Sequence, residues 1–100
     1  MMVTQSDNGR CISLKLREKL EVRLPESQVS GYVWEYREGC PALRLDDSDY
    51  AERGPARFTG TGERSWHFTA VATGGCTLSF YLVRPWSAPS LEFSLPVTVK

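Results

Sequence analysis

The side chains best suited to chemistry are a single histidine, His67, and three cysteines, at Cys11, Cys40 and Cys76. A catalytic cysteine needs a base that removes its proton, and here only His67 could serve. His67 lies between Trp66 and Phe68 in an alternating stretch, and this spacing turns its ring to the opposite face from theirs. We therefore expect a histidine on the solvent face of a strand and no catalytic site.

Metal and cofactor sites are equally poorly supported. No two cysteines have the C-x-x-C spacing of a zinc site. The aspartates at 46, 47 and 49 lack the spacing and the closing glutamate of a calcium loop. Gly60 and Gly62 precede neither a lysine nor a helix start that would suit a phosphate. We expect no metal, no cofactor and no enzyme, while the odd number of cysteines allows one disulfide and requires none.

The whole-chain composition limits the partners. One hundred residues predict a single domain, of which residues 1–10 form a polar, flexible segment unlike a signal peptide. Twelve basic and twelve acidic residues leave no net charge to attract nucleic acid or an anionic membrane, and no apolar run approaches the ~20 residues that span a bilayer. The compartment stays open: cytoplasmic, or periplasmic or secreted if a signal peptide has been removed.

Alternation of apolar and polar residues predicts an all-β fold. Short segments with this period of two recur about every ten residues, at 12–16, 20–24, 32–38, 42–45, 66–71, 77–83 and 91–99. Residues 14–24 also fit an amphipathic helix, but the period of two is unbroken on both sides of residues 17–19 and favours strands. The pattern indicates an antiparallel β-sandwich of about seven to eight strands.

Glycines, prolines and charges predict the connections. Residues 73–75 should turn 66–71 into 77–83 as a hairpin, and Pro25 should end the second strand. Residues 46–55 are acidic and lack periodicity, which is typical of a surface loop. Pro96 marks the last strand as an edge strand or as bulged.

Three loops could form a binding surface. The strand at 77–83 leads into Arg84, Pro85 and Trp86. These residue types suit a protein interface, and the strand before them would hold them rigidly. Residues 25–31 are mostly small or uncharged after Glu26, and could enter a narrow cleft at low desolvation cost. Residues 60–63 form a glycine-punctuated loop. If hairpins alternate ends, these three loops gather at one end of the sandwich.

The same loops resemble those of the chagasin family of cysteine-peptidase inhibitors. Arg84-Pro85-Trp86 matches its R-P-W loop completely. The stretch Ser27-Gln28-Val29-Ser30-Gly31, followed by Tyr32 and Trp34, resembles its N-P-T-T-G loop and the aromatic residues after it, although only Gly31 of the loop itself is identical. Gly60-Thr61-Gly62-Glu63 resembles its G-x-G-G loop, with Glu63 in place of the last glycine. The resemblance extends from about Leu20 to the C-terminus.

The resemblance implies an immunoglobulin-like sandwich that inhibits papain-like cysteine peptidases reversibly and competitively. Residues 27–31 would lie over the catalytic cysteine of the peptidase, while residues 60–63 and 84–86 would hold the cleft on either side. We expect a monomer that binds such a peptidase and has neither nucleic acid nor a membrane as a partner.

Two other classes of function compete with this interpretation. A binding module, for instance for carbohydrate, would need exposed aromatic rings, but Trp34 and Trp66 fall on predicted core faces and leave only Trp86. An enzyme would have only His67 and the thiols to use.

Overall fold

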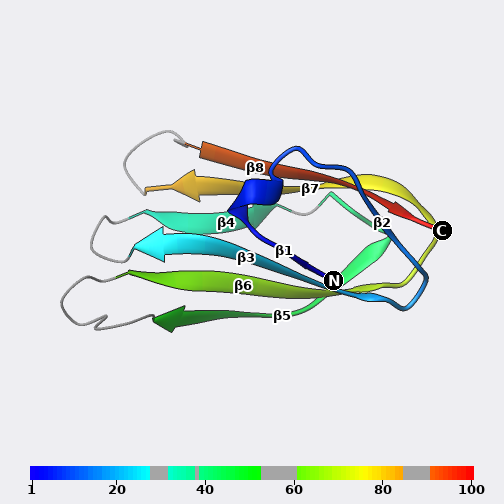
Figure 1. Cartoon of the computed structure of the whole chain (residues 1–100), viewed down its shortest axis with the longest axis horizontal. Coiled ribbons are helices and arrows are strands. Elements are labelled where there is room, and N and C mark those ends of the chain that lie inside the picture. Colours follow the sequence, from blue (N-terminus) through cyan, green and yellow to red (C-terminus); the bar gives the residue numbers. More distant parts are fainter. Residues whose placement is uncertain (28–31, 38, 53–60, 85–90) are drawn as a thin grey trace.

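The chain folds into two stacked β-sheets of four strands each (Figure 1). The computed structural model describes residues 1–27, 32–37, 39–52, 61–84 and 91–100. One sheet has the order β1-β3-β6-β5 and the other the order β2-β8-β7-β4. The strands are β1 (Met2–Val3), β2 (Ile12–Leu14), β3 (Lys19–Ser27), β4 (Val33–Arg37), β5 (Leu43–Glu52), β6 (Thr61–Ala70), β7 (Gly74–Val83) and β8 (Leu91–Val99). The predicted all-β sandwich is confirmed.

The core lies between the sheets and is centred on Phe80. Its side chain is fully buried, and its ring centroid lies 4.6 Å from that of Trp66 and 5.8 Å from that of Phe93. Trp66 belongs to one sheet and Phe80 to the other, so these rings pack across the sandwich. Leu78 and Phe80 are buried, and Leu82 packs against the core, as their alternation predicts.

The predicted hairpin of 66–71 with 77–83 is wrong. β6 pairs with β3 and β5, whereas β7 pairs with β4 and β8, so residues 71–73 carry the chain from one sheet to the other. Both strands alternate in the same way, and such a pattern suits two strands that face each other across a core as well as two that lie side by side. The glycine-rich turn therefore indicated a reversal of direction but not the sheet that the next strand joins.

The second strand continues through Pro25, where the sequence predicted its end. In β3, Pro25 pairs with Glu63 and Ser27 with Thr61. The carbonyl oxygen of Pro25 points away from β6, because it accepts a hydrogen bond from Nε1 of Trp34 at 2.8 Å. The missing N–H of the proline lies on that same side of the strand, so the ladder with β6 loses no hydrogen bond.

Most of the predicted acidic loop is a strand. Residues 46–52 belong to β5, which pairs along its length with β6 and has an irregular register between Leu45 and Asp47. Aspartates disfavour strands intrinsically, but an edge strand with charges on its outer side is a common arrangement. The irregularity explains why the alternation breaks, since an extra residue shifts side chains to the other face.

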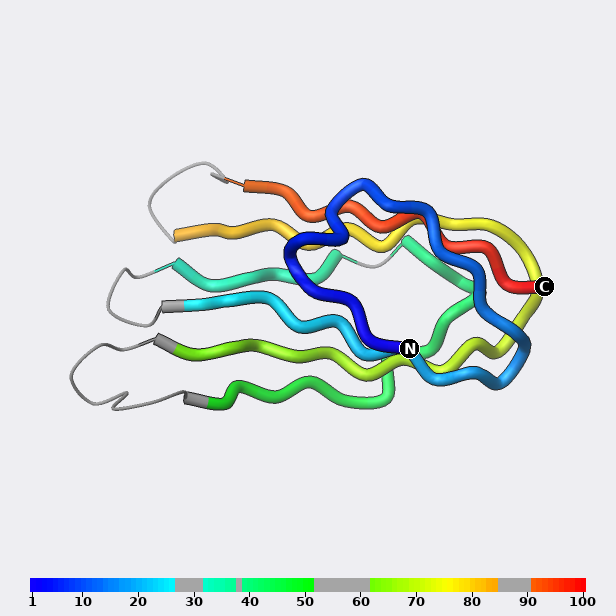
Figure 2. The backbone as a smooth tube through the Cα atoms, in the orientation of Figure 1, coloured from blue at the N-terminus to red at the C-terminus, as the bar shows by residue number. Residues whose placement is uncertain are grey.

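The first ten residues have more structure than the predicted flexible segment. They contain β1 and a 3-10 helix (Gln5–Asp7), and Figure 2 shows them crossing from the sheet of β3 toward the edge of β8. β1 pairs with β3 and β2 with β8, both in parallel, which adds two short parallel pairs to otherwise antiparallel sheets. β8 therefore has β2 and β7 as neighbours, and Pro96 lies just before the part that β2 covers. β2 and β3, where a helix was the alternative, belong to different sheets.

A disulfide joins Cys40 to Cys76, with a Cα–Cα distance of 5.0 Å. Cys11 is a free, exposed cysteine. Among the described residues, no cluster of histidine, cysteine and acidic side chains could hold a metal ion. Within the same ranges, no helix is long and apolar enough to cross a membrane.

Candidate peptidase-binding end of the sandwich

Six strand ends meet at one end of the molecule (Figure 1). β3 and β6 pair there at Ser27 and Thr61, and β5 and β6 pair at Glu52 and Gly62. In the other sheet, β4 and β7 pair at Val33 and Val83, and β7 and β8 pair as far as Leu82 and Leu91. We call this region the loop end, because residues 28–31, 53–60 and 85–90 connect these strand ends.

The predicted site residues divide into two groups. Gln28, Val29, Ser30, Gly31, Gly60, Pro85 and Trp86 lie outside the described residues. Ser27 is the last residue of β3, and Arg84 follows the end of β7. Thr61, Gly62 and Glu63, which the sequence placed in a loop, are the first residues of β6. All three pair with β3, and Gly62 and Glu63 also pair with β5.

Gly62 is needed for space rather than for an unusual backbone angle. A Cβ at this position would overlap the Tyr50 ring and would lie 2.8 Å from the carbonyl oxygen of Ala51. Gly62 is not among the described residues with positive φ, so the predicted turn glycine is instead a glycine within a strand. Its missing side chain lets the ring of Tyr50 lie against β6.

Arg84 contacts Tyr32, the residue that begins the described segment 32–37. Its guanidinium carbon lies 4.1 Å from the centroid of the Tyr32 ring, within the range of a cation–π interaction. Arg84 immediately precedes residues 85–90, and Tyr32 immediately follows residues 28–31. The contact therefore links the flanks of two of the three connecting segments.

Glu26 is a buried charged residue near the loop end that the sequence interpretation did not single out. It is 3% exposed, and its side chain bonds to groups from two other strands. Oε1 accepts a hydrogen bond from the backbone N–H of Trp34 at 2.8 Å, and Oε2 accepts one from Nη2 of Arg64 at 2.9 Å. Nε of Arg64 lies 3.0 Å and 3.1 Å from the two carboxylate oxygens. The alternation of Leu20, Leu24 and Glu26 on one face of β3 was the available signal, because it places the carboxylate on the buried side.

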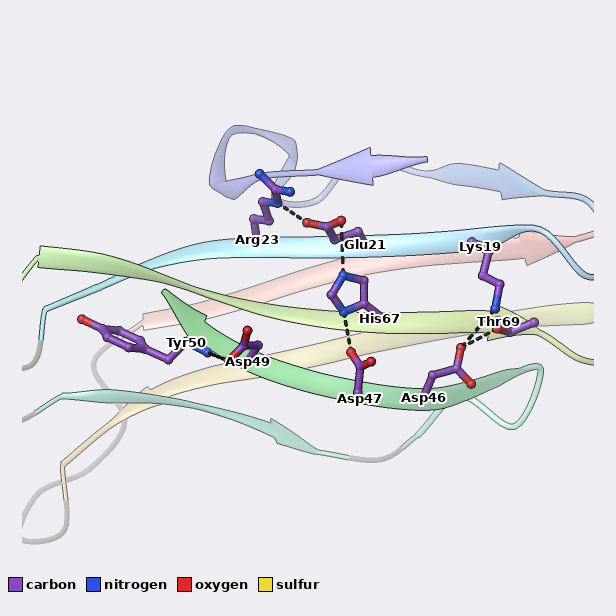
Figure 3. Close-up of polar contacts among 9 residues, drawn as sticks. All are labelled: Lys19, Glu21, Arg23, Asp46, Asp47, Asp49, Tyr50, His67 and Thr69. Atoms are coloured by element: carbon purple, nitrogen blue, oxygen red, sulfur yellow. Dashed lines mark hydrogen bonds and ion pairs between the residues drawn. The ribbon is translucent and has the colours of Figure 1, made fainter. Parts of the chain in front are cut away.

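His67 lies outside the loop end, on the outer face of the β1-β3-β6-β5 sheet (Figure 3). Its ring lies between two carboxylates, with Nδ1 2.5 Å from Asp47 and Nε2 3.3 Å from Glu21. The side chain is 41% exposed, as predicted for the solvent face. Its neighbours are acids from adjacent strands and not a thiol, so this cluster is a cross-strand polar network.

Two carboxylates of this face have lowered pKa values. A hydrogen bond from Arg23 lowers the pKa of Glu21 below its ordinary value, with additional attraction from Arg23 and His67. The Thr69 hydroxyl and then the Arg44 guanidinium bind Asp46 and lower its pKa. Both acids therefore favour their charged forms in the folded protein.

Known proteins resemble the chain in sequence and in fold. The family model described as Chagasin family peptidase inhibitor I42 matches residues 13–99. Chagasin from Trypanosoma cruzi is 24% identical over 93 residues, which cover 88% of this chain and 84% of that protein.

Solved structures share the fold. A cysteine protease inhibitor from Entamoeba histolytica superposes with a TM-score of 0.87 at 16% identity, over 99% of this chain and 94% of the other. The solution structure of Amebosin gives a TM-score of 0.80 at 23% identity, over 100% and 97% of the two chains. An inhibitor solved in complex with falcipain-2 gives 0.59 at 16% identity, over 99% and 86%.

The family model covers nearly the whole sandwich, from β2 to the end of β8. The predicted immunoglobulin-like fold and the family resemblance are both confirmed, and the chain is an inhibitor rather than an enzyme. This protein belongs to the chagasin family of peptidase inhibitors.

Proposed function

We propose that the chain inhibits papain-like cysteine peptidases reversibly and competitively, as a monomer whose loop end enters the active-site cleft. Family membership over residues 13–99 is the observation that carries the proposal. A relative of the same fold that was solved with falcipain-2 supports a peptidase as the partner. Nucleic acid and membranes are not part of the proposal, in keeping with a net charge of zero.

The proposed contacts come from residues 27–31, 60–63 and 84–86, at the loop end. Residues 27–31 cover the catalytic cysteine, where a small and uncharged segment loses little solvation. Residues 60–63 hold one wall of the cleft, and Arg84, Pro85 and Trp86 hold the other. The sandwich behind them reduces the entropy lost on binding, because the strand ends are already ordered.

A titration of active papain tests this function directly. We expect the wild-type chain to inhibit with competitive kinetics and without covalent modification of either protein. The activity of papain should recover when the complex is diluted. No inhibition of papain or of cathepsin-like enzymes at micromolar concentrations would refute the proposal.

Two variants test the proposed contacts. Trp86→Ala should raise the inhibition constant by roughly 30-fold to 1,000-fold if this ring is a binding hot spot worth about 2 to 4 kcal/mol. Ser30→Asp should weaken inhibition more than it lowers the melting temperature, because a charge in the cleft is costly to desolvate. Val71→Ala is the matched control, since Val71 is exposed and follows the end of β6 remote from the loop end. Unchanged inhibition by the Ser30 variant would count against residues 27–31 as the blocking segment.

The alternative of a carbohydrate-binding module gains no support. Trp34 and Trp66 are 6% and 4% exposed, so neither ring offers a sugar-binding platform. Trp86 lies outside the described residues.

A further inference from the structure

We infer that Glu26 and Arg64 are positioning residues for inhibition, because they tie the strands that flank residues 28–31 into one arrangement. This inference rests on the proposed function and adds two residues outside the peptidase-binding loops. Among the described residues, Glu26 is the one charged side chain that is buried. Such a burial is costly unless the charge is paired, and replacing a buried ion pair by apolar groups often leaves stability unchanged or higher. The pair therefore needs an explanation other than stability.

β3 and β4 are consecutive strands that belong to different sheets. β3 pairs with β1 and β6, and β4 pairs with β7. No ladder of backbone hydrogen bonds joins the described parts of these two strands, although residues 28–31 connect them. Something else must set their relative position at the loop end.

Two hydrogen bonds take over this role. The backbone N–H of Trp34, on the free edge of β4, donates to Oε1 of Glu26, and the indole Nε1–H donates to the carbonyl oxygen of Pro25, both at 2.8 Å. One amino acid of β4 is thus held by two consecutive residues of β3. The ends of the segment that we propose to cover the catalytic cysteine are fixed by these bonds.

Arg64 extends the same connection to the second loop. Its guanidinium binds both oxygens of Glu26 and so holds the carboxylate in the orientation that Trp34 requires. Arg64 lies on β6 close to residues 53–60, and its guanidinium carbon lies 5.5 Å from the centroid of the Tyr50 ring on β5. The ends of β3, β4, β5 and β6 are therefore coupled through one buried side chain.

A neutral and an apolar variant separate positioning from stability. Glu26→Gln keeps the shape of the side chain but puts an amide NH₂ against the donors of Arg64 or Trp34. The double variant Glu26→Leu/Arg64→Met removes both charges and fills the space with apolar groups. We expect the double variant to lower the urea midpoint only slightly, because apolar packing replaces the ion pair while the buried N–H of Trp34 loses its acceptor. Both variants should raise the inhibition constant for papain about tenfold, because the ends of β3 and β4 must then be brought into position on binding.

Amide hydrogen exchange tests directly whether Glu26 holds Trp34, while the inhibition constant compared with the urea midpoint separates positioning from stability. The Trp34 amide should exchange about tenfold faster in both variants, since its acceptor is weakened or absent. Val99→Ala is the control, because Val99 is buried at the opposite end of β8: it should lower the urea midpoint while the inhibition constant and Trp34 exchange stay at wild-type values.

The outcomes distinguish this inference from the proposed function. If the wild type inhibits papain and the double variant has the same inhibition constant, the positioning role is refuted. If the wild type does not inhibit, the proposed function fails, and the inference about inhibition fails with it. Trp34 exchange then still decides whether Glu26 holds the two strands together. Wild-type exchange rates in both variants would refute that connection independently of any peptidase.

Discussion

The Cys40–Cys76 disulfide should stabilise the fold without affecting inhibition. The perturbation is the double variant Cys40→Ala/Cys76→Ala in a Cys11→Ser background, which prevents the free thiol of Cys11 from forming other pairs. Cys76 lies near the start of β7, and the loop end lies at its other end, at Val83. At about 3.3 Å per residue, the strand between them spans roughly 23 Å.

The expected loss follows from the length of the closed loop. The two cysteines are 36 positions apart, and the chain-entropy model gives about 4 kcal/mol for a cross-link that closes a loop of this size. A domain of this size typically has an unfolding free energy of roughly 5 to 15 kcal/mol, so the variant should remain folded at 25 °C but with a much smaller margin. The melting temperature should fall by roughly 15 to 30 °C.

Urea unfolding followed by tryptophan fluorescence measures the effect, since Trp34 and Trp66 are buried. The Cys11→Ser protein with its disulfide intact is the control, and reduction of that protein by dithiothreitol should reproduce the loss seen in the double variant. The inhibition constant for papain, measured at 25 °C, should change by less than about threefold. An unchanged urea midpoint in the double variant would show that the cross-link does not constrain the unfolded chain. A large change in its inhibition constant, with the fold intact, would show that the two ends of the sandwich are coupled.

Three further predictions concern the described strands. Gly62→Ala should lower the unfolding free energy by about 1 to 3 kcal/mol in urea titrations, because the new Cβ overlaps Tyr50; wild-type stability would contradict the close contact. The hydrogen bond from Thr69 is the main reason why the pKa of Asp46 is lowered, so the contribution of Asp46 to stability is present above its ordinary pKa of 3.8 and is lost as the pH falls through the folded value. The Asp46→Asn variant should therefore lose less unfolding free energy than the wild type between pH 5 and pH 2. Identical acid profiles of the two proteins would refute the reasoning. His67→Gln should leave papain inhibition unchanged, because the ring lies on the outer face of the sheet, and a clear loss of inhibition would contradict this placement.

Local patterns in the sequence predicted most of the strands but not their partners. The alternation around Phe80 predicted both a strand and its buried face, because the period of two depends on the backbone alone. The same alternation could not show that β6 and β7 belong to different sheets, since pairing depends on residues distant in sequence. Pro25 shows the same limit: whether a proline ends a strand depends on which side of the strand has a neighbour.

The candidate site divides in a similar way. Arg84, Pro85 and Trp86 were identifiable from their residue types and order, and together with residues 27–31 and 60–63 they indicated the family. The sequence also determined the fold class and the solvent-facing side of His67, because both follow from short-range alternation. Only the tertiary structure showed that Glu26 is buried against Trp34 and Arg64, and that Gly62 makes room for Tyr50. These contacts join different strands, and that of Glu26 with Trp34 joins the two sheets. No spacing within one segment records which strand will lie beside it.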